Sequence, residues 1–405
     1  MEKVETYRAQ IDPPNVDLTR LRAYRLERIR EQLRAAEAAF AILVNPISLR
    51  YAIDCREYQG IQSRIPFMYL FVAADGPAVM YGTNYGGFEG VDDYRPATRN
   101  NAFEGGLDLA DNARLLADDV TAFMHEIGLK NDTRRVAVEM FNPSVTQALL
   151  QAGIDPIDAE PLVERARSIK SAEEIQCMRH SIAVAEHGFT RMRDATEPGI
   201  RETELWALLH QVNVAHDGDW FDGRMLCSGP RTNPWMQEAT AREVEAGDLV
   251  AFDSDMIGPF GYCADISRTW LCGPAEPTPA QRDVYQRTFD EVHHNIELVR
   301  PGVTFFEFTD KAFRQPEEFI ARRYPTPCHG IGMSDEYPKI FYRQDVHNAY
   351  DGVIEENMTL CVESYCGSER GGPGVKLEQM VLVTDSGCEL LSQFPFETEL
   401  LGSSA

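Results

Sequence analysis

Three aspartates lie in a short segment of the chain whose pattern predicts a β-hairpin. Two runs rich in strand-forming residues, Leu249–Met256 and Tyr262–Leu271, flank a Gly-Pro turn signal. Alternation along a strand is expected to place Asp253 and Asp255 on one face, and Asp265 on the returning strand can face them. Converging carboxylates repel one another unless cations are present, so the segment predicts a metal site; a solvated polar strand face is the alternative interpretation.

Further metal-binding residue types follow in the last third of the chain. Two more predicted strands, Thr359–Tyr365 and Val375–Thr384, each carry one central glutamate, so Glu363 and Glu378 are expected to be cross-strand neighbours. Between the two hairpins lies His329, in a Cys-His-Gly-Ile-Gly segment whose small residues allow a close backbone approach. Five carboxylates and one imidazole suit two divalent metal ions, and iron, manganese, zinc and cobalt all fit these ligands.

The order of these motifs resembles the pita-bread superfamily of methionine aminopeptidases, prolidases and creatinases. The resemblance covers most of the chain and rests on Ile-Lys-Ser-x-x-Glu-Ile from Ile169, Pro-Gly-Ile from Pro198, Gly-Asp-Leu-Val from Gly247, Gly-Tyr-x-x-Asp-Ile-x-Arg-Thr from Gly261, and His-Gly-Ile-Gly from His329. It implies a small noncatalytic N-terminal domain and a C-terminal catalytic domain that holds the metals.

Departures from the peptidase pattern indicate a branch of this superfamily. Ser254 stands where the peptidases usually have their first metal aspartate, and it is flanked by Asp253 and Asp255. The two peptidase histidines are also missing, since their places fall near Met236 and at Met333. The segments Asp-x-Asp-Met-Ile-Gly-Pro-x-Gly-Tyr-Cys and His-Gly-x-Gly-x-x-Asp-Glu-Tyr-Pro are instead similar to those of DddP-type dimethylsulfoniopropionate (DMSP) lyases.

This second resemblance implies a reaction and roles for individual residues. The family cleaves DMSP to dimethyl sulfide and acrylate, and the resemblance implies iron as the metal and a homodimer as the assembly. Eliminating dimethyl sulfide needs a general base that is not itself a metal ligand, because ligation stabilises the charged form of a carboxylate. Asp335 matches the position of that base, and Tyr324 matches a donor to substrate or intermediate.

Two other classes of function remain open. A peptidase or amidohydrolase of the same superfamily, acting on Xaa-Pro dipeptides or a compatible solute, would use the metals to make a hydroxide nucleophile. A noncatalytic binding protein is the third hypothesis, although such relatives usually lose ligands and this set is complete. Trp220 and Trp235 could line a substrate pocket, but a single tryptophan is more often part of a core.

Length and composition agree with a two-domain enzyme. The 405 residues favour about two domains, and the resemblance implies an α/β (α+β) protein with an N-terminal creatinase-like domain at 1–165 and a pita-bread catalytic domain at 166–405. A formal net charge of −25 argues against a nucleic-acid partner. The polar N-terminus, the lack of a long apolar run and nine scattered cysteines predict a cytoplasmic protein with reduced thiols and no membrane partner.

Local patterns predict the elements that position the site. Asp17 is expected to cap an amphipathic helix, followed by a buried strand at Phe40–Val44. In the C-terminal domain, Ser171 and Glu174 form a predicted capping box, and a second helix is expected from Glu202 to about Val214.

Overall fold

A six-stranded mixed sheet forms the centre of the N-terminal unit, Asp17–Arg167. The computed structural model describes residues 11–56, 65–82, 87–128 and 134–401. The strand order is β4-β3-β2-β1-β5-β6, in which β1 pairs antiparallel with β2 and parallel with β5. The strands are β1 (Phe40–Leu43), β2 (Tyr69–Ala73), β3 (Ala78–Tyr81), β4 (Asp93–Arg95), β5 (Arg135–Val138) and β6 (Asp155–Asp158).

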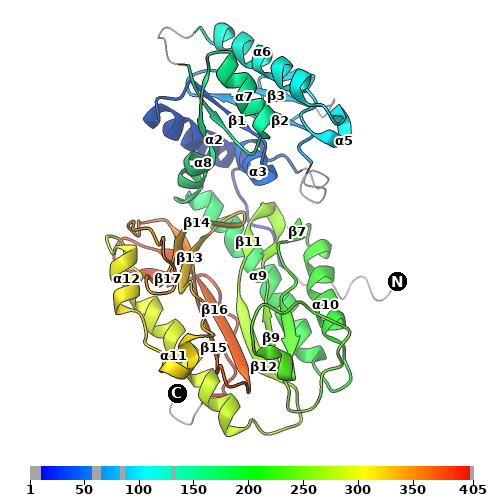
Figure 1. Cartoon of the computed structure of the whole chain (residues 1–405). Helices are drawn as coiled ribbons and strands as arrows, with labels where there is room; N and C mark the ends of the chain where they lie inside the picture. The colour runs from blue at the N-terminus through cyan, green and yellow to red at the C-terminus, as the bar shows by residue number, and fades with distance from the viewer. Residues whose placement is uncertain (1–10, 57–64, 83–86, 129–133, 402–405) are drawn as a thin grey trace. The chain divides into compact units, whose positions relative to one another are not determined.

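Helices cover both faces of this sheet (Figure 1). The prediction for the first helix is confirmed, because the side chain of Asp17 accepts a hydrogen bond from Arg20 N at 3.0 Å and α2 buries Leu21, Leu26 and Leu33. The helices are α2 (Leu18–Ala35), α3 (Pro46–Ile53), α5 (Ala102–Gly105), α6 (Ala110–Glu126), α7 (Pro143–Gln151) and α8 (Glu160–Arg167).

The second unit, described over residues 11–16 and 168–401, contains three antiparallel sheets. Two are three-stranded, in the orders β11-β10-β7 and β12-β9-β8, and one is five-stranded, β14-β13-β15-β16-β17. The strands are β7 (Trp220–Phe221), β8 (Leu226–Ser228), β9 (Leu249–Asp253), β10 (Met256–Ile257), β11 (Cys263–Ala264), β12 (Ser267–Leu271), β13 (Cys328–Ile331), β14 (Asp335–Ile340), β15 (Thr359–Gly367), β16 (Gly374–Val383) and β17 (Cys388–Leu390).

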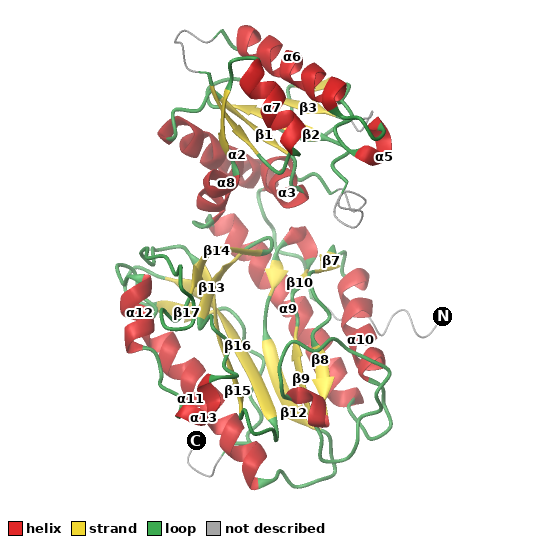
Figure 2. Cartoon of the chain, in the orientation of Figure 1, coloured by secondary structure: helices red, strands yellow, loops and turns green. Residues whose placement is uncertain are grey.

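Helices flank these sheets (Figure 2). They are α9 (Ala172–Ala195), α10 (Glu202–Ala215), α11 (Pro279–Leu298), α12 (Phe305–Lys311) and α13 (Glu317–Ile320), with short 3₁₀ turns η1 (Gly229–Thr232) and η2 (Pro259–Gly261). The capping box at Ser171 and Glu174 is confirmed, since each side chain bonds the backbone N–H of the other residue. None of the helices in the described ranges is both long and apolar enough to cross a membrane.

Strand β16 connects the sheets around the acidic residues of the predicted site. Thr269 Oγ1 on β12 donates to Lys376 O on β16 at 2.9 Å and accepts from Lys376 N at 3.2 Å. Helix α11 packs against β15 and β16 on the side of the core that contains Val292, Leu377 and Val375. The acidic residues of β9, β15 and β16, and Asp265 just before β12, are therefore buried where these strands pack together.

Candidate metal centre

The acidic hairpin supplies three carboxylates where the β9–β12 pair ends. The predicted hairpin is confirmed, with Ser267 on β12 opposite Asp253 on β9. The strand is not continuous, however, because Asp255 has a φ of 36° and lies in the break between β9 and β10. Strand alternation therefore does not explain how Asp253 and Asp255 come together. The chain bends there instead, and ligand atoms of Asp253, Asp255 and Asp265 lie within 4.8 Å of one another.

Ser254 holds this bend in place. Its buried hydroxyl donates to Ala264 O at 2.7 Å and accepts from Ile266 N at 2.9 Å. Both contacts cross the hairpin and bracket Asp265 on the opposite segment. The hydroxyl thus fixes the distance between the two acidic segments.

Two glutamates complete the acidic set from the neighbouring sheet. Glu363 on β15 is directly opposite Glu378 on β16, which confirms the predicted cross-strand pairing. Both side chains are buried, with relative exposures of 2% and 1%. Ser267 Oγ donates to Glu378 Oε2 at 2.7 Å, so this glutamate is tied to the strand that follows Asp265.

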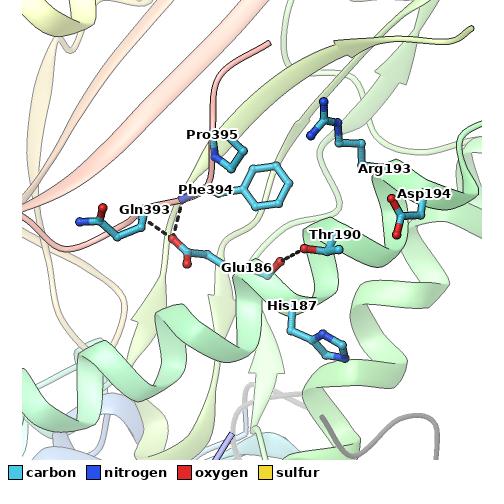
Figure 3. Close-up of a pocket in the computed structure, with 8 residues that line it drawn as sticks. All are labelled: Glu186, His187, Thr190, Arg193, Asp194, Gln393, Phe394 and Pro395. Carbon is cyan, nitrogen blue, oxygen red and sulfur yellow. Dashed lines mark hydrogen bonds between the residues drawn. The ribbon is translucent and has the colours of Figure 1, made fainter. Parts of the chain in front are cut away.

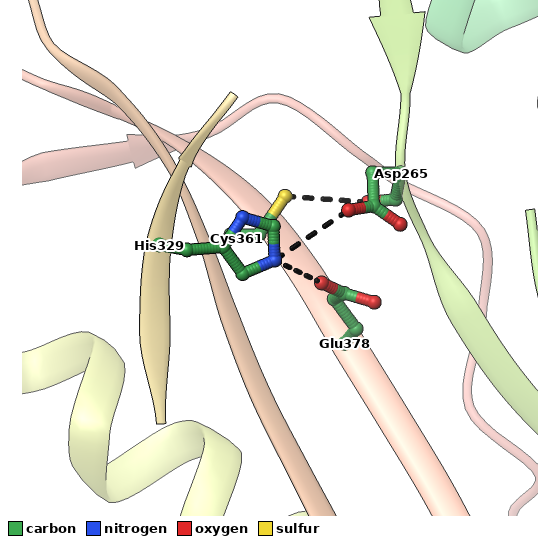
Figure 4. Close-up of side chains that lie close together, drawn as sticks. All are labelled: Asp265, His329, Cys361 and Glu378. Atoms are coloured by element: carbon green, nitrogen blue, oxygen red, sulfur yellow. Dashed lines mark hydrogen bonds and ion pairs between the residues drawn. The ribbon is translucent and has the colours of Figure 1, made fainter. Parts of the chain in front are cut away.

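His329 on β13 points one ring nitrogen at the carboxylates. Its Nε2 lies 3.3 Å from Glu378 Oε1, 3.5 Å from Glu363 Oε1 and 3.5 Å from Asp265 Oδ2 (Figure 4). Its Nδ1 lies 3.1 Å from Gly330 O, and with a metal ion bound a proton on Nδ1 would leave the Nε2 lone pair for the ion. Desolvation lowers the proton affinity of the imidazole, but the neighbouring carboxylates, led by Asp335, outweigh it and raise the pKa of His329 to about 10.

The carboxylates contain oxygen atoms that the fold does not satisfy. Among the described residues, Asp253 Oδ1, Asp265 Oδ1, Glu363 Oε1 and Glu378 Oε1 are buried without a hydrogen-bond partner. Desolvation and the neighbouring carboxylates, Glu378 above all, raise the pKa of Asp265 well above its usual range. Buried, unpaired carboxylate oxygens around an imidazole fit a divalent cation, which supplies the missing charge and ligation.

Sequence reasoning missed Lys376, which also lies in the centre. Its buried Nζ is 2.7 Å from Glu363 Oε2, 3.1 Å from Glu378 Oε2 and 3.3 Å from Asp253 Oδ2. Burial would raise the pKa of Glu378, but Lys376 and His329 outweigh it and hold that pKa below its usual value. Lys376 is two residues before Glu378, so period-two alternation along this strand could have placed it on the same face.

Asp335 and Tyr324 flank the centre from outside the group of predicted ligands. Asp335 begins β14, its Oδ1 lies 3.8 Å from His329 Nδ1, and its side chain is 60% exposed. Tyr324 precedes β13, and its ring lies 5.3 Å from Lys376 Nζ. Desolvation and the charge of Glu363 raise the pKa of Tyr324, so its hydroxyl keeps its proton and remains a donor.

The two tryptophans occupy different environments. Trp220 is half-buried on β7, opposite Ile257. Trp235 is 7% exposed and stacks on Tyr365, with ring centroids 6.0 Å apart, in a small apolar cluster against which Tyr324 packs. The cluster that contains Trp235 therefore borders Tyr324, whose ring faces Lys376.

Asp222, just after β7, is a second residue that sequence reasoning missed. Its main-chain N donates to Asp255 O at 3.0 Å. Desolvation and the nearby charge of Asp335 raise the pKa of Asp222 to about 6. The next residue is Gly223, where a Cβ atom would lie only 2.8 Å from Asp255 Oδ2, so a larger residue here would displace the Asp255 carboxylate.

A separate pocket of about 330 Å³ lies between α9 and the segment 393–395 (Figure 3). Glu186 accepts hydrogen bonds there from the main-chain N atoms of Gln393 and Phe394. Arg193, also in its lining, pairs with Glu397 at 2.7 Å. These charges are used within the fold, so the enclosed acidic cluster is the better candidate for chemistry.

Comparisons with known proteins agree with this choice. Residues 176–385 match a family model described as Metallopeptidase family M24. The dimethylsulfoniopropionate lyase DddP of Roseovarius nubinhibens is 34% identical over 399 residues, which cover 95% of this chain and 89% of that protein. The DddP lyase of Roseobacter denitrificans is 32% identical, with 98% and 91% covered.

Peptidases share the fold. The Xaa-Pro dipeptidase of Lactobacillus helveticus is 27% identical, with 89% of this chain and 95% of that protein covered. The structure of the Xaa-Pro dipeptidase from Bacillus anthracis matches with a TM-score of 0.73 at 22% identity, covering 93% of this chain and 99% of that one. This likeness confirms the predicted fold class, a mixed α/β N-terminal unit with the curled antiparallel sheets of pita-bread structures.

Proposed function

The chain belongs to metallopeptidase family M24, and we propose that within this family it is a metal-dependent carbon–sulfur lyase that cleaves DMSP to dimethyl sulfide and acrylate. The observation that carries the proposal is the position of Asp335. This carboxylate is outside the buried acidic group, and its Oδ1 lies 3.8 Å from His329 Nδ1. The similarity to two DddP lyases over nearly the whole chain supports the same substrate.

The proposed cofactor is a pair of divalent metal ions. The five carboxylates of the centre and one ammonium, which pairs with three of them, leave four negative charges that two divalent ions would neutralise. Iron is the proposed metal by analogy with the DddP lyases, and manganese, zinc and cobalt are the alternatives. The proposed ligands are Asp253, Asp255, Asp265, His329, Glu363 and Glu378.

The residues around the metals then have separate tasks. When bound, the ions polarise the substrate carboxylate and make the adjacent C–H bond more acidic. Asp335 accepts the proton from that carbon, the electron pair forms the C=C bond of acrylate, and the C–S bond breaks with its electrons leaving on dimethyl sulfide. Asp335 returns the proton to solvent, for which its exposed position is suited. The protonated hydroxyl of Tyr324 donates a hydrogen bond that orients the substrate.

A peptidase of the Xaa-Pro type is the alternative that the fold likeness favours. The absence of a histidine near Met236 and at Met333 weighs against it, because the peptidases use histidines at the corresponding places. The two hypotheses are separated by incubating the metal-loaded protein with DMSP or with an Xaa-Pro dipeptide. We expect dimethyl sulfide in the headspace and no release of proline; proline release without dimethyl sulfide would contradict the lyase.

We also propose a homodimer, by analogy with the resembling family. Light scattering is expected to give about twice the 45.6 kDa of one chain. A single-chain mass at micromolar concentration would rule the dimer out.

A further inference from the structure

Cys361 brings a sulfur atom into the candidate metal centre. Its Sγ and ligand atoms of Asp265, His329 and Glu378 all lie within 4.8 Å of one another. Figure 4 shows the thiol beside the imidazole, and it donates to Asp265 O at 3.6 Å. The residue is fully buried. The sulfur therefore shares an enclosed space with three of the proposed ligands.

Strand geometry directs this thiol toward the centre. Cys361 lies on β15 opposite His329 on one side and Met380 on the other. Its neighbours Leu360 and Val362 belong to a hydrophobic cluster. Alternation then places Cys361 on the opposite face, which it shares with Glu363.

The atoms that surround the sulfur call for a cation. In the part of the chain that the structure describes, Asp265 Oδ1 and Glu378 Oε1 are buried without a hydrogen-bond partner. The S–H group is a weak donor and already faces the main-chain oxygen of Asp265. A metal ion would satisfy both carboxylate oxygens and accept an electron pair from sulfur at the same time.

We propose that Cys361 Sγ is a donor to the metal ion held by Asp265, His329 and Glu378. This inference rests on the metal centre of the proposed function but not on its substrate. On binding, the S–H bond breaks, its proton passes to the buffer, and a metal–sulfur bond forms with no change of oxidation state. Sulfur donors favour iron(II), cobalt(II) and zinc(II) over manganese(II) and magnesium, so Cys361 makes this position selective.

Cobalt(II) provides the test, because a thiolate bound to cobalt gives an intense charge-transfer band in the near ultraviolet. The full-length protein is stripped with a chelator, loaded with cobalt, and its metal content measured. We expect the band in the parent protein and its loss in Cys361→Ser, which still binds cobalt through the remaining ligands. The preference of the protein for zinc over manganese is expected to fall about tenfold in this variant.

Cys366 provides the matched control, because it lies on the same strand but packs into the hydrophobic cluster beside α11. Cys366→Ser should keep the band.

If Cys361→Ser fails to fold, X-ray absorption of the zinc-loaded parent protein gives an independent answer, because a sulfur neighbour is expected at about 2.3 Å from the zinc. Bound cobalt without the band, or bound zinc without a sulfur neighbour, contradicts Cys361 as a metal ligand and leaves the metal centre itself unaffected. Failure to bind any metal overturns the metal centre as well.

Discussion

Lys376 Nζ lies 2.7 Å from Glu363 Oε2, inside a centre in which carboxylates outnumber the basic groups. Both side chains are essentially excluded from solvent, at 1% and 2% exposure. In metal-free protein this ammonium is the main counter-charge of the cluster. Removing it leaves buried carboxylates without compensation, which costs about 3–5 kcal/mol when one partner of a buried pair is lost.

Lys376→Met is therefore expected to destabilise the metal-free protein strongly and the metal-loaded protein much less. The reason is that bound cations replace the missing charge. Thermal unfolding with a chelator and with added metal measures the difference. Lys376→Arg, which keeps the charge, is the control and should stay close to the parent protein. Equal destabilisation of Lys376→Met in both conditions would show that the lysine acts through packing instead.

Loss of ligands should remove the metal. In Asp265→Ala combined with His329→Ala, two of the groups that face Glu378 disappear, so the protein is expected to retain almost no metal after dialysis. Elemental analysis against protein concentration gives the content. Asp283→Ala, which removes an exposed carboxylate paired with Arg287 on α11, is the control and should leave the content unchanged. Full retention by the double variant would refute this ligand set.

Several parts of the site could be predicted because they depend on local rules. Glu363 and Glu378 face each other because two strands joined by a short turn have a fixed register, and alternation along them is regular. The capping box at Ser171 is equally local. By contrast, the approach of Asp253 to Asp255 depends on a positive φ and on Ser254 bridging the hairpin, neither of which follows from strand periodicity.

Burial by a neighbouring sheet explains the residues that were missed. Lys376 on a strand is ordinarily expected at a solvated edge, and the packing of β16 against β12 and β9 encloses it. Cys361 has no ligand-like spacing in the sequence, because its neighbours in the cluster come from three other strands or loops. Asp222 reaches the centre through the pairing of β7 with β10, two strands of two residues each. Such short strands give almost no periodic signal.

The N-terminal unit offers a prediction of pH dependence. Asp54 ends α3 in the left-handed conformation, with a φ of 53°, and forms ion pairs with Arg22 and with fully buried Arg25. Burial alone would raise the pKa of Asp54, but Arg25 and then Arg22 outweigh it and hold the pKa below its usual range. The folded state thus binds this proton more weakly than the unfolded state, so the stabilisation is complete above about pH 4 and is lost as the pH falls further.

Asp54→Asn isolates this charge, since asparagine tolerates the left-handed conformation. We expect it to lower the stability around α2 and α3 by about 3 kcal/mol at neutral pH, because Arg25 loses its anionic partner. Hydrogen exchange of these two helices measures the effect. The difference from the parent protein should shrink as the pH falls below about 4. A difference that persists unchanged at low pH would indicate lost hydrogen bonding, not lost charge.

Asp335→Asn is expected to remove chemistry without removing metal. The side chain lies beside His329 but outside the buried acidic group, so both metals should remain while proton acceptance is lost. Dimethyl sulfide release should fall about 10²–10⁴-fold, the usual contribution of a general base.

If Asp335 only supports a turn, the amide oxygen would still accept the same hydrogen bond and activity would survive. Asp351→Asn is the matched control, because Asp351 is exposed, accepts from Phe306 N and Gly352 N, and is outside the acidic cluster. If the metal-loaded Asp335→Asn protein were as active as this control, the general base would have to be another group.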